Sequence, residues 1–449
     1  MKPDERSPSD EHLVPGAASD GIEPDLPPLR HNRNYRRLWF GQAASLLGNE
    51  VLDTTIMLWL GLIAAGDQPW GPAAVAGALA AGTIPVLLFG TIGGVYADRW
   101  DRRRIMLATD AIRGCLVLAL ALLLIVGEDL PVAVRLSVSY AVIVACAVAA
   151  QFFNPARYGL LATVVADADR ERMGSITAGT SALAGIVGPA VAAGLVVVAN
   201  VQWALLITAA GFALSYAAVA KVRAARTAET TPNAAAELPG MWRELRTGLT
   251  FFAGNQVLKV MLITTVVVVA GVASINTLDI FFITRNLHAP VEVYGVLGTA
   301  FSIGSLLGAG LAALFAARIR STRVYAYGFM LVGLLLIVYS RMTTPLGAII
   351  VLFLIGIPAA AVSSMIGPLI MRSTPSHLIG RVSGVLQPAS ELGSLVSVAV
   401  VAWLASSVLH DLNTTVAGVH FSTIDTIFLA IGAIVALTAV YTARALRNV

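Results

Sequence analysis

The sequence predicts an all-α membrane protein whose twelve transmembrane helices form two pseudo-symmetric six-helix bundles. Three observations lead to this fold class: an apolar composition, a series of long apolar segments, and a polar stretch that divides the chain into similar halves. Hydrophobic residues make up 57% of the 449 residues and charged residues only 12%, and the mean hydropathy is +0.79. Soluble globular chains are far more polar, so this composition indicates a protein of the lipid bilayer.

Twelve segments are long and apolar enough to cross roughly 30 Å of hydrocarbon as helices. An even number of spans puts both chain ends on the same side of the membrane. The predicted spans are 38–64, 71–96, 105–126, 132–153, 174–198, 202–221, 257–283, 293–316, 324–341, 346–371, 382–408 and 424–443.

The basic residues predict the orientation, because short cytoplasmic loops of membrane proteins are enriched in Lys and Arg. With cytoplasmic termini, 27 of the 30 basic residues lie on the cytoplasmic side, and only Arg135, Arg285 and Arg341 lie outside. The same bias explains the net charge of +4, so no nucleic-acid partner is required. We expect a multi-pass protein of the cell membrane, in bacteria the inner membrane.

Two polar stretches set the expected domain limits. The tail, residues 1–34, begins with a Pro-rich and acidic stretch and is expected to be disordered and cytoplasmic. A second polar stretch, 223–250, predicts a cytoplasmic linker between bundles at 35–222 and 251–449. Motifs of the first half have weak counterparts in the second, which is typical of the internal repeats of transporters.

A charged run follows the second apolar segment. Gly94 lies four residues before the pair Asp98-Arg99, and Arg102, Arg103 and a third arginine follow. The run resembles the signature loop between helices 2 and 3 of the major facilitator superfamily of secondary transporters. The resemblance implies the two-bundle fold of that family. It also implies that Gly94, Asp98, Arg99, Arg102 and Arg103 form a conformational latch that braces the outward-facing state. The alternative is a loop that only satisfies the charge rule for orientation.

A proline between glycines marks the fifth span. Gly185, Gly188, Pro189 and Gly194 would bend this helix and allow another helix to approach closely. The pattern resembles the helix-5 motif of the drug and proton antiporters of the superfamily, although alanines stand where that motif prefers a second glycine pair. The alternative is ordinary packing of small residues.

A further resemblance narrows the branch of the superfamily. Pro155-Ala156-Arg157, followed by an amphipathic stretch and Gly174, is similar to the branch that includes enterobactin-type siderophore exporters and macrolide efflux proteins. Exporters of small molecules are therefore what the resemblance implies.

Polar side chains within the spans are the candidate transport residues, since an acid at a helix centre costs about 2.5–3.5 kcal/mol unless it faces a cavity or a partner. Asn49 and Asp53 are one turn apart in the first span and share a helix face. The candidates are Asn49, Glu50, Asp53, Asn276, Asp279 and Glu391.

A carboxylic acid in such a site can bind and release protons as a cavity opens to either side. We expect Asp53, Glu50 and Glu391 to carry protons or bind cationic substrate, with Asp279 nearer the outer vestibule. For each of these acids the alternative is a structural role. Asp110 and Arg113, three residues apart, predict a local ion pair.

Enzyme motifs are missing from the sequence. A phosphate-binding loop needs Gly-Lys followed by Ser or Thr, but the three lysines precede Pro, Val and Val. The six histidines form no His-Glu-x-x-His metal site. We therefore expect no enzyme, no metal and no cofactor, with the proton gradient as the energy source.

Together these features predict a monomeric exporter of lipophilic small molecules, such as drugs, dyes or natural products, that works in the lipid bilayer by proton antiport and alternating access. Two alternatives stay open. A nutrient importer or uniporter on the same fold would have a more polar cavity rich in Asn, Gln and Arg. A non-transporting sensor or scaffold would tolerate neutralisation of Asp53 and Glu391.

Overall fold

The computed structural model describes residues 27–64, 70–127, 129–166, 169–222, 254–315, 321–374, 379–409, 412–416 and 419–445. Most of the predicted tail and the whole predicted linker 223–250 lie outside these residues. The described part contains twelve α-helices of 20 residues or more. They are α1 (Arg33–Ala64), α2 (Gly71–Arg99), α3 (Arg102–Val126), α4 (Val132–Val164), α5 (Arg170–Ala199), α6 (Val201–Ala220), α8 (Gln256–Phe281), α9 (Val293–Phe315), α10 (Ser321–Ser340), α11 (Pro345–Ser373), α12 (Ile379–Trp403) and α13 (Thr423–Ala445).

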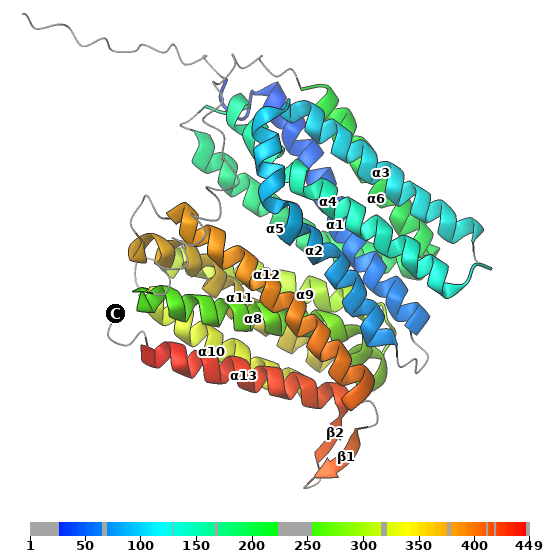
Figure 1. The fold of residues 1–449 in the computed structure, drawn as a ribbon, viewed down its shortest axis with the longest axis vertical. Coiled ribbons are helices and arrows are strands. Elements are labelled where there is room, and N and C mark those ends of the chain that lie inside the picture. The colour runs from blue at the N-terminus through cyan, green and yellow to red at the C-terminus, as the bar shows by residue number, and fades with distance from the viewer. Residues whose placement is uncertain are drawn as a thin grey trace, which may run out of the picture.

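The helices form two groups (Figure 1). Helices α1 to α6 pack on one another in the N bundle, and α8 to α13 pack on one another in the C bundle. The predicted fold class, an all-α membrane protein of the two-bundle kind, is confirmed. Among the described residues, eleven helices are long and apolar enough to span a membrane. Helix α1 is not one of the eleven, because Glu50 and Asp53 interrupt its apolar sequence, but at 32 residues it is as long as its neighbours.

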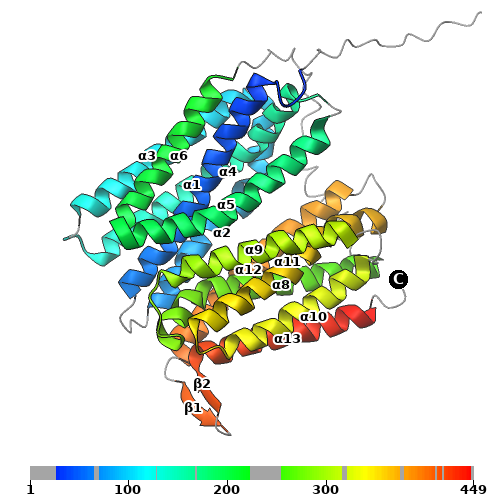
Figure 2. The same ribbon diagram turned by 180° about the vertical axis from the view of Figure 1, so that it is seen from behind.

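The two bundles meet at one end of the molecule and separate toward the other, as both views show (Figures 1 and 2). We call the end where α1 begins and α13 finishes the terminal end, and the opposite end, which carries a short hairpin, the hairpin end. Gly61 of α1 packs on Ile280 of α8 near the hairpin end. In contrast, a methyl group at Gly174 or Gly310, near the terminal end, would meet no atom within 4 Å.

Helix α4 is longer than expected. The sequence predicts a span that ends at residue 153, but the helix continues through Pro155 to Val164. Pro155 has no N–H to donate to the carbonyl group of Gln151. Gly93 of α2 packs directly on that carbonyl, since a Cβ at residue 93 would lie 2.1 Å from the Gln151 oxygen. The neighbouring helix thus covers the site where the proline interrupts the helix, and α4 continues.

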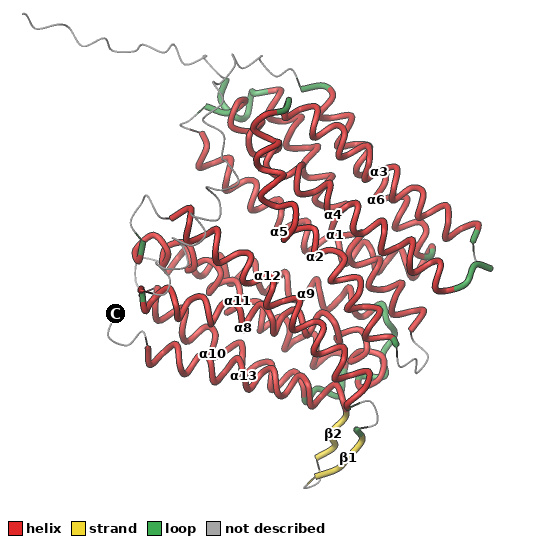
Figure 3. The backbone as a smooth tube through the Cα atoms, viewed as in Figure 1, coloured by secondary structure: helices red, strands yellow, loops and turns green. Residues whose placement is uncertain are grey.

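Three small elements were not predicted from the sequence. Two π-helical turns, η2 (Phe282–Asn286) and η4 (Leu404–Val408), extend α8 and α12 at the hairpin end. An antiparallel hairpin of β1 (Asn413–Val416) and β2 (Val419–Ser422) precedes α13, with Asn413 opposite Ser422. Figure 3 shows the strands outside the helical body.

Candidate functional site

A cavity of about 520 Å³, which we call the central cavity, lies at mid-length of the N-bundle helices. Its walls come from α1, α2 and α4, and the C bundle adds Asn276 of α8 and Tyr294 of α9. Most of the lining is apolar, from side chains such as Ile56, Met57 and Val86. Residues of both bundles therefore enclose one space that suits a small, largely apolar molecule.

Asp53 is the charged residue of this wall among the described lining residues. Helix α1 packs on α5 and α6, but the side chain of Asp53 is exposed because it faces the central cavity. Asn49, one turn earlier, lines the same wall, as do the amides of Gln151 and Asn276. The cavity thus offers one carboxylate and three amides to a bound molecule.

Glu50 lies beside this wall and packs on α5. A Cβ at Gly188 would lie 2.3 Å from the Cβ of Glu50, so the glycine is what permits α1 and α5 to approach. Glu50 is half-buried and is not among the residues that line the central cavity.

The helix-5 motif also connects the two bundles. A Cβ at Gly295 of α9 would lie 2.4 Å from the Cβ of Ala193 and 2.6 Å from the carbonyl oxygen of Pro189. Thr299 donates a hydrogen bond of 3.2 Å to the carbonyl group of Ile186. A Cβ at Gly185 would meet Ser302 at 3.5 Å, whereas Gly194 has no neighbour within 4 Å. The motif residues from 185 to 193 therefore form the contact between α5 and α9.

Asp279 lies in the core of the C bundle and is 5% exposed. The hydroxyl group of Tyr339 donates a hydrogen bond to its carboxylate. Tyr339 in turn packs on the rings of Phe282 and Phe428, with centroids 5.0 and 5.8 Å away. The sequence places Asp279 nearer the outer vestibule, but the structure encloses it behind aromatic side chains.

Glu391 is separated from the other candidates. It is half-buried on α12, and its carboxylate accepts a hydrogen bond of 2.8 Å from the amide of Gln387, one turn away. It does not line the central cavity. The structure therefore brings Asn49, Asp53 and Asn276 together, with Glu50 adjacent, and leaves Asp279 and Glu391 elsewhere.

The arginines of the charged run bind helix carbonyl groups within the N bundle. Arg102 donates to the carbonyl of Gly159 in α4 at 3.2 Å, and Arg103 donates to the carbonyls of Val219 and Ala220 at the end of α6. Val219 and Ala220 lie in the last turn of α6, and the C-terminal end of a helix favours a cation. Arg99 is exposed. The side chain of Asp98 lies outside the described part.

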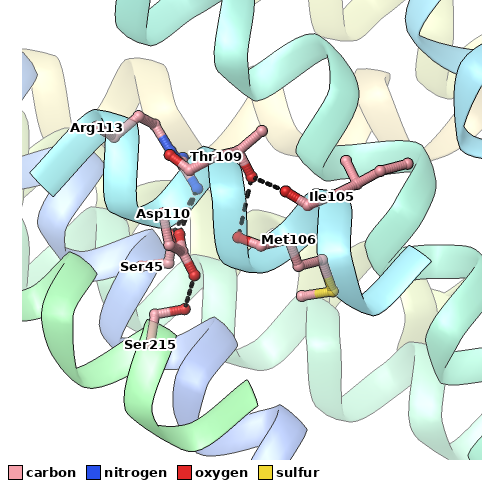
Figure 4. A network of polar contacts seen from close by, with 7 residues as sticks. All are labelled: Ser45, Ile105, Met106, Thr109, Asp110, Arg113 and Ser215. Atoms are coloured by element: carbon pink, nitrogen blue, oxygen red, sulfur yellow. Dashed lines mark hydrogen bonds and ion pairs between the residues drawn. The ribbon is translucent and has the colours of Figure 1, made fainter. Parts of the chain in front are cut away.

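Asp110 and Arg113 form an ion pair of 2.7 Å, so this prediction is confirmed (Figure 4). Ser215 of α6 donates to Asp110 at 2.6 Å, and the Arg113 guanidinium lies 4.4 Å from the ring centroid of Phe153. Both charged side chains are buried. The pair therefore joins α3, α4 and α6 in the core of the N bundle instead of linking one turn at its surface.

Four lining residues whose side chains carry a hydroxyl, thiol or amide group were missed by the sequence analysis: Thr83, Cys146, Gln151 and Tyr294. Gln151 carried a usable signal, because an amide within an apolar span needs a partner or a cavity. Cys146 is buried, and one side of it lines the cavity. Tyr294 lies within electrostatic range of both Asp53 and Asp279. In the described part of the chain, no group of three His, Cys, Asp or Glu side chains could hold a metal ion.

Macrolide efflux protein A of Streptococcus pyogenes is similar to this chain. The two are 26% identical over 285 residues, which are 63% of this chain and 66% of that protein. Among solved structures, a mutant of the nucleoside transporter NupG superposes with a TM-score of 0.71 at 13% identity, covering 92% of this chain and 100% of that one. A bacterial homologue of the iron transporter ferroportin in an inward-facing state gives 0.69 at 13% identity, covering 92% and 98%.

At such identities the two solved structures show the fold alone. The family is shown by a sequence model described as Major Facilitator Superfamily, which matches residues 38–398, most of the chain. Twelve long helices in two bundles around a central cavity agree with that match. The chain therefore belongs to the Major Facilitator Superfamily and is a multi-pass membrane transporter, not an enzyme.

Proposed function

We propose that this transporter exports lipophilic small molecules, such as drugs, dyes or natural products, in exchange for protons. The observation that carries the proposal is the single carboxylate, Asp53, on the wall of a cavity whose other described lining residues are uncharged or apolar. One carboxylate holds either a proton or a cationic cargo. The proton and the cargo compete for the Asp53 carboxylate, so binding of one displaces the other. Cargo that binds on the cytoplasmic side therefore releases a proton there, and a proton that binds on the outer side releases the cargo.

The direction of opening follows from the expected orientation. The excess of basic residues assigns the terminal end to the cytoplasm. The bundles separate at that end, so this conformation would admit cargo from the cytoplasm and release protons there. Alternating access then requires the terminal ends to close and the hairpin ends to part. We propose a monomer as the working unit, with residues of both bundles of the same chain lining the central cavity.

The latch is part of the same proposal. A Cβ at Gly94, in the last two turns of α2, would meet nothing within 4 Å in this conformation. We expect a C-bundle helix to reach Gly94 and the adjacent Asp98 and Arg99 only when the terminal ends close. Arg102 and Arg103 would then anchor the loop to α4 and α6 throughout.

The similarity to macrolide efflux protein A supports export, although the matched region is 66% of that protein. A second candidate function has its own observation. The amides of Asn49, Gln151 and Asn276 on the cavity wall would hydrogen-bond a polar solute, which favours an importer or uniporter of a small nutrient.

The test is substrate-driven proton release from energised everted vesicles, with a panel of lipophilic cations and neutral antibiotics. We expect release with the parent chain, none with Asp53→Asn, and release with Glu391→Gln, whose carboxylate is outside the cavity. Undiminished release with Asp53→Asn would contradict the proposal. Failure of the whole panel with accumulation of a polar nutrient in right-side-out vesicles would establish the importer. Failure of both assays with a well-expressed protein would favour a sensor or scaffold.

A further inference from the structure

A further cavity, which we call the N-bundle pocket, lies at the hairpin end of the N bundle. Its volume is about 420 Å³, and it shares no lining residue with the central cavity. The ends of α1, α3 and α5 and the beginnings of α4 and α6 supply its described walls. All of these helices belong to the N bundle, so the pocket does not depend on how the two bundles meet.

Arg135, in the first turn of α4, is the charged residue among the described lining residues of this pocket. Its side chain is half-buried, and its Nε atom is buried without a hydrogen-bond partner. None of the ion pairs in the described part of the chain includes Arg135. A buried donor without an acceptor is unfavourable, so this guanidinium group has a hydrogen bond to give to a molecule in the pocket.

The start of α6 adds further donors. Val201 and Gln202 are its first two residues, and both line the pocket. The first N–H groups of a helix have no acceptor within that helix, and no side-chain hydrogen bond caps this one. The last turn of α5 also lines the pocket, through Val196. The partial charges of the two helix ends, about half an elementary charge each, have opposite signs and offset one another, so the full charge of Arg135 makes the pocket positive.

The chemistry of the lining indicates the class of ligand. A guanidinium group presents a planar edge of N–H donors that matches the oxygens of a carboxylate or phosphate group. The apolar side chains of Trp59, Leu62 and Leu124 form another part of the wall. They suit the hydrocarbon part of an organic anion, because burial of apolar surface is favourable.

We propose that the N-bundle pocket binds an oxyanion, a carboxylate or phosphate group carried by a small solute or by a lipid headgroup. The guanidinium group of Arg135 would hold the anion, and the N–H groups of Val201 and Gln202 would add donors. The bound group would thereby join α4 to α6 at the hairpin end. The site is separate from Asp53 and does not depend on the proposed export.

The test is isothermal titration of the purified full chain in a neutral detergent, with butyrate and with inorganic phosphate at constant ionic strength. We expect saturable binding of at least one anion. Arg135→Gln should weaken it by at least about tenfold, because a charge-assisted hydrogen bond is lost. Arg341→Gln should leave it unchanged. Arg341 is the matched control, since it is another basic residue expected on the outer side and lines a different cavity.

The charge of the pocket can also be changed while Arg135 is kept. Asn200 is an exposed lining residue between α5 and α6 with a φ of 71°. Asn200→Asp adds a carboxylate to the wall and should weaken anion binding, which covers the case that Arg135→Gln does not fold. Asn200→Gly is its matched control, since glycine adopts a positive φ without strain, and it should bind as the parent does.

Titration in nanodiscs of phosphatidylglycerol and of phosphatidylcholine separates the two sources of the anion. Weaker binding of the titrated anion only with phosphatidylglycerol would identify the lipid headgroup as the ligand, and equal binding in both would identify a small solute. No saturable binding of either anion to the parent in detergent would overturn the proposal. Equal weakening by Arg135→Gln and Arg341→Gln, or undiminished binding by Asn200→Asp, would overturn it as well.

Discussion

Asp53 and Asp279 lie on corresponding helices of the two bundles, α1 and α8, but they differ in exposure and in their hydrogen-bond partners. Asp53 faces a cavity that residues of both bundles line, and amide side chains are its neighbours there. Asp279 is enclosed in the C bundle, where the hydroxyl group of Tyr339 donates to it and aromatic rings cover the pair. A carboxyl group within a membrane span is therefore not a transport residue by position alone. A carboxylate can take part in transport if it faces a cavity, whereas a carboxylate with a fixed hydrogen-bond donor in the core has a structural role.

The N bundle contains a second example of an enclosed acid. Asp110 has two fixed donors, Arg113 and Ser215, and is as deeply buried as Asp279. One acid is therefore accessible, and two acids make buried hydrogen bonds within their own bundles.

The strongest contrast is expected in transport. Asp53→Asn should reduce substrate-driven proton flux in everted vesicles to the level of vesicles without the protein, because the amide cannot exchange a proton. Asp279→Asn should keep most of the flux, since an amide oxygen can still accept the hydrogen bond from Tyr339. Equal loss in the two variants, at equal expression, would mean that the enclosed acid also takes part in transport.

The largest change in stability is expected when Asp110 loses its partner Arg113. Arg113→Met should lower the free energy of unfolding by about 3–5 kcal/mol, because Asp110 becomes a buried charge without its partner. Chemical unfolding in detergent, followed by circular dichroism, measures the change.

Arg104→Met is the matched control for that experiment. Arg104 and Asp101 have the same spacing in sequence as Arg113 and Asp110, but they are 4.0 Å apart with side chains 87% and 58% exposed. Little change is expected there, since exposed ion pairs contribute about 0–1 kcal/mol. A small effect at Arg113 as well would show that the buried pair does not hold α3 in place.

The contact between α5 and α9 at the hairpin end can be disrupted at Gly295, the residue after Tyr294. Gly295→Ala puts a methyl group 2.4 Å from the Cβ of Ala193, and overpacking of this kind costs about 1–3 kcal/mol. We expect the hairpin ends to part. Spin labels at the exposed positions Leu62 and Leu346, in a chain without the native cysteines, should report a longer distance.

Gly298→Ala provides the control on the same helix. A methyl group there would meet Pro189 at 3.5 Å, an ordinary contact, so the distance distribution should match that of the parent. Identical distributions in the parent and Gly295→Ala would show that the α5–α9 contact does not determine the conformation.

The smallest effect is expected from removing the hydroxyl group of Tyr339, which donates a hydrogen bond to Asp279. Tyr339→Phe removes one hydrogen bond and should lower the free energy of unfolding by about 1 kcal/mol while transport continues. Tyr327→Phe, on an exposed side chain of the same helix, should change neither quantity. A loss of transport in Tyr339→Phe, without loss of protein, would contradict the structural role of this pair.

The helices could be predicted closely from the sequence because apolar length alone defines a membrane span. The span expected at 71–96 is the helix Gly71–Arg99, and the one expected at 424–443 is Thr423–Ala445. The expected end of α4 at residue 153 was wrong, because the helix continues through Pro155 to Val164. Gly93, which is distant in sequence, packs on the carbonyl group of Gln151 there. The hairpin before α13 was missed because its short polar strands follow no membrane pattern.

The candidate site could be predicted only in part. The spacing of Asn49 and Asp53 places both on one face of α1, and helical geometry is sufficient for that inference. The distinction between Asp53 and Asp279 was out of reach, because it depends on Tyr339, a residue 60 positions away from Asp279 in sequence. The contribution of Tyr294 to the cavity likewise depends on how the second bundle packs against the first.

We propose that Asp53 is accessible from the terminal end and that Asp279 is not. The most direct measurement is the rate at which a membrane-impermeant methanethiosulfonate reagent labels Asp53→Cys and Asp279→Cys in everted vesicles, in a chain without the native cysteines. We expect rapid labelling at position 53, and labelling at position 279 only after unfolding. Rapid labelling at position 279, or none at position 53, would contradict it.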